Sequence, residues 1–230
     1  RNLTAEMESI LKQFKIYCED EKLDIELLYL MTEQTFIKDI PSLILNKYIY
    51  PTGEDFEVIG RLLFSTQSRL NNISKLSKKY DSLYEILKNE NVSYDMFYEY
   101  QKKDLDWLKQ KNIIDFNKDN QIIFDNHKLA LLYQLYDYNV VVFDCIKEYQ
   151  TIIEEFVEIG IVEYSSSLLS LPEQEYYNYL FNEVNWNNGL IIRNKYSHGT
   201  QRRNDKENMH DYFILIRVII LIVIKINQEL

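Results

Sequence analysis

The scarcity of glycine and proline constrains the fold of this chain more than any other feature. Only five glycines and three prolines occur in 230 residues, whereas strands joined by tight turns need these residues at many of the turns. The interior of a helix, by contrast, disfavours both. The sequence therefore predicts a mainly α-helical fold.

Apolar residues recur at helical spacing along the first part of the chain. A stripe at intervals of three and four predicts a helix over residues 3–18, and a second helix follows over 23–37 and ends near Pro41. Two further stripes predict helices over 56–63 and 76–87.

Residues 105–135 follow another pattern. A helix end around Trp107 precedes two short apolar runs, 113–116 and 121–124, which flank a polar turn, and a new helix begins at His127. This order predicts a small two-stranded hairpin between helices, similar to a piece of a winged-helix module. Aspartates surround it and no basic footprint accompanies it, which favours a packing or protein-contact role over the alternative of DNA binding.

The C-terminal half holds the clearest helical stripes. Apolar residues mark one face of a helix over 142–156. Ser170 and Glu173 then form a capping-box pattern that opens a helix from Glu173 to about Val184.

A final helix is predicted from about Lys206 to Gln228. Its segment Tyr212–Ile226 is apolar almost all round and is broken only by Arg217. Fifteen residues are too few to span a bilayer, and a central arginine opposes insertion. We interpret the segment as the central helix of a helical core, although its β-branched residues would also suit a buried strand.

Two regions are expected, a helical N-terminal region over 1–125 and a helical bundle over 127–230. Cys18 and Cys145 stand far apart without histidine partners, so neither a zinc site nor a disulfide is predicted. No signal-peptide pattern is present, and we expect a cytoplasmic protein without metal or cofactor. The chain begins on Arg1, so we expect a fragment of a longer protein or a processed form.

One basic island interrupts the C-terminal half. The stretch Gly189-Leu-Ile-Ile-Arg193-Asn194-Lys195-Tyr196-Ser-His198-Gly199 lies between two predicted helices. From Asn187 to Asn204 no acid occurs, while four cations do, in a chain whose net charge is −10. Repulsion from the acidic remainder would direct an RNA backbone toward this island.

This island resembles the signature of the HEPN family (higher eukaryotes and prokaryotes nucleotide-binding). Nuclease members of that family carry an arginine, four to six residues and a histidine at the mouth of their last helix, as Arg193 and His198 do here. Asn194 after the arginine and Gly199 after the histidine also match. The resemblance covers residues 127–230 and implies a helical bundle that acts as a homodimer or higher homo-oligomer on RNA without a metal.

The resemblance also implies roles for these residues. His198 would transfer protons near neutral pH, and Arg193 would clamp the phosphate. Two such pairs facing each other would cleave RNA by attack of the 2′-hydroxyl, so DNA would be inert. Asn194 would support this pair. The weaker candidates for RNA binding are Lys195, Tyr196, Arg202 and Arg203.

Other interpretations stay open. Arg193 near a helix end and Gly199 after it would also suit a purely structural helix junction, in a non-catalytic module for assembly or nucleotide sensing. Some HEPN toxins carry a tyrosine two residues after the histidine, where this chain has Thr200. That difference favours a HEPN domain within a larger antiviral defence protein of the abortive-infection kind, attached to or regulated by another domain.

Overall fold

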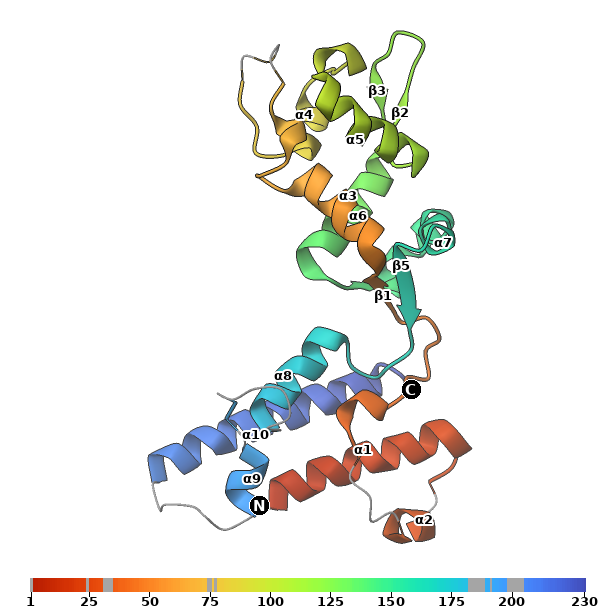
Figure 1. Ribbon diagram of the computed structural model, residues 1–230. Coiled ribbons are helices and arrows are strands. Elements are labelled where there is room, and N and C mark those ends of the chain that lie inside the picture. The colour runs from red at the N-terminus through yellow and green to blue at the C-terminus, as the bar shows by residue number, and fades with distance from the viewer. Residues whose placement is uncertain are drawn as a thin grey trace. The chain divides into compact units, whose positions relative to one another are not determined.

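The computed structural model describes residues 2–23, 25–30, 35–73, 76, 78–181, 189–190, 192–197 and 205–230. Over these residues the fold is mainly α-helical, which confirms the fold class (Figure 1). The chain divides into two compact units. Unit 1 contains Arg1–Lys47 and Ser165–Leu230, and unit 2 contains Tyr48–Tyr164.

This division differs from the expected one at residues 125–127. Helix α1 (Asn2–Asp20) packs against α10 (Asp205–Asn227) from the other end of the sequence. Within unit 2, α6 (Asn126–Tyr138) packs against α3 (Gly53–Phe64). Local patterns do not reveal such long-range pairings, so the sequence did not show that unit 2 is inserted between the two parts of unit 1.

Unit 1 is helical and includes α8 (Leu171–Phe181) and α9 (Ile192–Ser197), which lie with α1 and α10 (Figure 1). The predicted cap of α8 is present, since the Glu173 carboxylate accepts hydrogen bonds from the Ser170 N–H at 2.8 Å and its hydroxyl at 2.9 Å. The core of the unit is built from buried apolar side chains of all four helices. They include Met7, Leu11, Phe14, Tyr177, Leu180, Phe181, Ile192, Leu215, Val218 and Ile222.

The second predicted helix is shorter than expected. Helix α2 covers Ile25–Leu30, residues 24 and 31–34 lie outside the described residues, and Ile37 belongs to the 3₁₀ turn η1 (Ile37–Asp39). Ile37 and Ile40 are buried against the core of unit 1, so burial of this turn accounts for the apolar residues that suggested a longer helix.

Unit 2 holds α3, α4 (Leu83–Asn89), α5 (Glu99–Gln110), α6 and α7 (Gln150–Glu158), with the 3₁₀ turns η2 (Arg69–Asn71) and η3 (Tyr94–Met96). The predicted hairpin is confirmed. Strands β2 (Asp115–Phe116) and β3 (Ile122–Ile123) pair antiparallel between α5 and α6.

Helix α4 begins later than the apolar stripe over 76–87 predicts. The Ser82 hydroxyl accepts a hydrogen bond from the Glu85 N–H at 3.2 Å, and the extended backbone of Ser82 ends the preceding segment. A serine cap of this kind overrides the apolar spacing that precedes it.

A three-stranded sheet in unit 2 was not predicted. Strands β4 (Val141–Val142), β1 (Tyr48–Pro51) and β5 (Val162–Ser165) lie in that order, with β1 and β4 antiparallel. The predicted helix over 142–156 is therefore wrong in its first half, where β4 and the 3₁₀ segment η4 (Phe143–Tyr149) precede α7. Three consecutive valines, which favour strand, explain the difference.

Two glycines with positive φ meet where this sheet joins the helices. Gly53, with φ +76°, opens α3, and a Cβ there would lie 3.0 Å from the Gly160 carbonyl oxygen. Gly160 has φ +72°, and a Cβ there would meet nothing within 4 Å. The two positions share the backbone conformation and differ in the space beside it.

Replacement of Gly53 by alanine should therefore destabilise the protein more than replacement of Gly160. We expect Gly160→Ala to lower the free energy of unfolding by about 1 kcal/mol through backbone strain, and Gly53→Ala by about 2 kcal/mol because the Cβ also crowds a carbonyl. Urea denaturation of the two variants measures this difference, and equal losses would contradict it.

Candidate functional site

The predicted site segment lies in unit 1 between α8 and α10. Arg193 and Asn194 belong to α9, which is anchored by the fully buried Ile192. Just before α9, the Leu190 N–H donates a hydrogen bond to the Tyr179 carbonyl of α8 at 3.1 Å. The other predicted residues of the island, His198, Arg202 and Arg203, lie outside the described residues.

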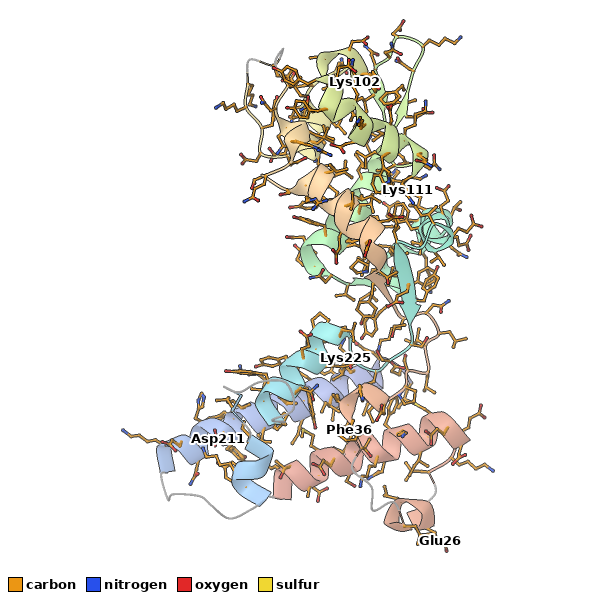
Figure 2. All side chains as sticks on the ribbon, viewed as in Figure 1. Glu26, Phe36, Lys102, Lys111, Asp211 and Lys225 are labelled. Atoms are coloured by element: carbon orange, nitrogen blue, oxygen red, sulfur yellow. The ribbon has the colours of Figure 1, made fainter. Side chains whose placement is uncertain are left out.

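A buried carboxylate on α10 holds α9 in place. The Lys195 ammonium lies 2.6 Å from Oδ2 of Asp211, and the Tyr196 hydroxyl donates to the same oxygen at 2.9 Å. Tyr196 also reaches Oδ1 of Asn208 at 3.3 Å. Asp211, labelled in Figure 2, is only 5% exposed. We call these four residues the Asp211 clamp.

The electrostatics of the clamp follow from burial. Burial of the Tyr196 hydroxyl, together with its hydrogen bond to Asp211 and the charge of that carboxylate, raises the pKa of Tyr196 to about 12. The phenol therefore stays neutral and keeps donating its proton to Asp211 throughout the physiological range. Lys195 supplies the positive charge that a buried carboxylate requires, and Glu207 adds a longer contact to Lys195 at 3.9 Å.

These contacts give Lys195 and Tyr196 an intramolecular role. Both were predicted to contact RNA, and the structure brings both onto Asp211 of their own chain, while Tyr196 also contacts the Asn208 amide. Their partner Asp211 was not singled out from the sequence. An aspartate at the start of a nearly all-apolar helix was the available signal, because a carboxylate at a buried position needs partners.

Helix α10 has a second apolar face. Leu215, Val218 and Ile222 are buried in the core of unit 1, while another stripe of the same helix is largely exposed. Its residues follow the alternating spacing of four and three that lines the seam of a coiled coil. They are Met209, Phe213, Ile216, Ile220 and Val223, of which Phe213 is 60% and Met209 56% exposed.

This stripe qualifies the expectation of a central core helix. The segment Tyr212–Ile226 is helical, so the strand alternative is wrong, but the residues of this segment described as buried all lie on one face of the helix. His210 and Arg217 are exposed on the same helix. A contiguous apolar stripe at the surface is typical of a site of protein association.

Within the described ranges, no three His, Cys, Asp or Glu side chains gather in a way that could hold a metal ion. In the same part of the chain, no helix has the length and apolarity that a membrane crossing requires.

No protein-family model, no curated protein and no solved structure matches the chain.

Loss of the Asp211 carboxylate should destabilise unit 1. We expect Asp211→Ala to lower the free energy of unfolding by about 2 kcal/mol, because the substitution leaves Lys195 and Tyr196 without their shared partner. Glu207→Ala is the matched control, since Glu207 is mostly exposed and should cost no more than about 0.5 kcal/mol. Chemical denaturation compares the two, and equal losses would show that the clamp is not a stabilising contact.

Proposed function

We propose that this chain is a metal-independent endoribonuclease of the HEPN type, in which two copies present Arg193 and His198 to one phosphodiester. The observation that carries the proposal is the Asp211 clamp. Two adjacent residues of α9, Lys195 and Tyr196, are tied to a buried carboxylate on the last helix. The clamp thereby holds the segment that carries Arg193 against the start of α10.

The chemistry assigned to the pair follows from its side chains. His198 can exchange a proton near neutral pH, and Arg193 keeps its charge at any physiological pH and can hold a phosphate through two hydrogen bonds. Cleavage needs a base for the ribose 2′-hydroxyl and an acid for the departing 5′-oxygen. A second copy of His198 supplies the second of these groups, with Asn194 in a supporting role.

The exposed stripe of α10 supports the proposal that a second copy of the chain completes the site. The stripe from Met209 to Val223 can pair with the same stripe of a second copy. It begins four residues after the first residue of α10. A parallel two-fold pairing along this seam would set the starts of the two α10 helices side by side, about 10 Å apart. Helix α9, which the Asp211 clamp ties to α10, would then lie near the same axis in both copies.

The charge of the island supports an RNA substrate. Since Lys195 is held by Asp211, Arg193, Arg202 and Arg203 are the cations of the island that we assign to the RNA backbone. A metal-independent ribonuclease of this kind fits a toxin-like role in phage defence, with the activity controlled by other parts of a larger protein.

A non-catalytic assembly module is the second candidate. The α10 stripe favours it as well, because an apolar seam serves association whether or not a reaction follows. The two candidates differ in one outcome, which is whether the associated protein cleaves RNA.

Cleavage of labelled RNA tests the assignment directly. We expect the wild-type protein to cleave single-stranded RNA equally with and without EDTA, to leave 2′,3′-cyclic phosphate ends, and to spare DNA of the same sequence. Arg193→Ala and His198→Ala should each reduce the rate by about 10² or more. The matched controls are Arg61→Ala and His127→Ala, which change an exposed arginine and histidine of unit 2 and should keep the wild-type rate.

Equal cleavage by the wild type and both site variants would mean that a contaminant acts, and it would overturn the assignment. Absence of cleavage by an associated wild-type protein would favour the assembly module.

The proposed association through α10 has its own test. The double variant Phe213→Glu and Ile220→Glu should be monomeric by light scattering and should lose RNA cleavage, because two charges enter the apolar seam on each copy. Leu45→Glu is the control, since Leu45 is an 81% exposed leucine of unit 1 outside α10. A double variant that stays associated would place the interface elsewhere.

A further inference from the structure

Unit 2 contains a pocket that the proposed nuclease does not use. It lies where α4 and the residues just before it meet the end of α3 and the middle of α6, and it has a volume of about 690 Å³. Figure 1 shows these three helices within unit 2. We call it the α4–α6 pocket.

Stacked aromatic rings form one wall of the pocket. The rings of Tyr84 and Tyr133 lie 5.4 Å apart with an angle of 14° between their planes. Phe64, which is buried, meets both rings edge-on with centroids 5.4 Å away and so fixes their orientation. Tyr133 is 41% exposed, which leaves part of this aromatic wall accessible to a planar group.

Lysines surround these rings. Lys78, Lys79 and Lys88 line the same pocket and are exposed. The Lys88 ammonium lies 5.1 Å from the centre of the Tyr84 ring, and the Lys78 ammonium lies 4.8 Å from that of Tyr80. Among the residues that the structure describes, none of the ion pairs involves these three lysines. Their charge is therefore available to an anion.

The acids of the pocket weaken this charge without cancelling it. Asp81 and Glu85 also line the pocket, so three lysines face two carboxylates and one net positive charge remains. The Glu85 carboxylate accepts a hydrogen bond from the Asp81 N–H at 3.1 Å and is thus partly used by the protein itself. In a chain of net charge −10, this pocket is a place where an anion meets a positive surface.

We propose that the α4–α6 pocket binds a phosphorylated nucleobase, either a free nucleotide or one residue of a single-stranded nucleic acid. The base stacks on the exposed ring of Tyr133, which Tyr84 supports from its other side, and the phosphate contacts Lys78, Lys79 and Lys88. Stacking on exposed aromatic rings beside a cationic rim is the general way in which proteins hold unpaired bases, and a pocket of this size accommodates a nucleotide. This site is independent of the proposed nuclease chemistry, because it uses no residue of the Arg193 segment.

Binding measurements on the full chain test the proposal with two probes. The first is ATP, followed by calorimetry, and the second is a fluorescein-labelled ten-nucleotide single-stranded oligo(dA), followed by anisotropy. A DNA strand is used because it lacks the 2′-hydroxyl and stays intact whether or not the chain cleaves RNA. Binding of ATP alone identifies a free nucleotide as the ligand, and preferential binding of the strand identifies a nucleic acid.

Substitutions of the pocket residues show whether the probes bind in the α4–α6 pocket. Tyr133→Ala should weaken binding about tenfold, whereas Tyr133→Phe should retain it, because stacking needs the ring and not the hydroxyl. The triple variant Lys78→Ala, Lys79→Ala and Lys88→Ala should weaken binding and reduce its dependence on salt. The controls are Tyr138→Ala on α6 and Lys103→Ala on α5, which are exposed and outside the pocket.

Thermal unfolding of each variant separates loss of binding from loss of the fold. Failure of both probes to bind at about 1 mM, or equal binding by the pocket variants and the wild type, would overturn the proposal. Since neither probe can report RNA cleavage, these outcomes leave the proposed nuclease to its own test.

Discussion

The buried carboxylate of Asp211 is the contact on which the proposed site depends. Helix α9 has only six residues, Ile192–Ser197, and a helix so short has no stability of its own in water. Ile192 in the core and the hydrogen bonds of Lys195 and Tyr196 to Asp211 fix it against α10. A buried carboxylate is costly unless it is paired, so the chain keeps this charge only where two partners reach it.

Helix α10 packs against α1, so both ends of the sequence meet in unit 1. A second, apolar face of α10 is exposed. The pairing of α10 with α1 makes unit 1 from both termini of the chain, and unit 2 is inserted between residues 47 and 165. Just after α10, the side chain of Glu229 is buried and binds Lys47 and Ser42. Near the end of the helix, Glu173 pairs with Lys225, labelled in Figure 2, at 2.8 Å. Polar contacts thus hold α10 near both ends, and its exposed apolar stripe lies between them.

Several elements could be predicted from the sequence, because their signals are local. Helices α3 and α10 could be predicted from apolar spacing over a few helical turns. The hairpin before α6 could be predicted from two short apolar runs that flank a polar turn. The sheet β4-β1-β5 could not be predicted in this way, because its strands are short and lie far apart in the sequence. The same holds for Asp211, since its burial depends on where α9 packs. At the candidate site, residue type indicated Arg193 and His198, but only packing revealed that Lys195 and Tyr196 support the helix.

The central claim is that two copies of the chain share one site that needs both copies of His198, and mixing wild-type protein with the His198→Ala variant tests it most directly. The total protein concentration is held constant, and exchange of subunits is confirmed by co-purification of differently tagged copies. A mixed dimer retains one histidine and lacks the second group for proton transfer. The account predicts that RNA cleavage falls as the square of the wild-type fraction. Cleavage that falls in direct proportion to the wild-type fraction, although the subunits exchange, would contradict the shared site.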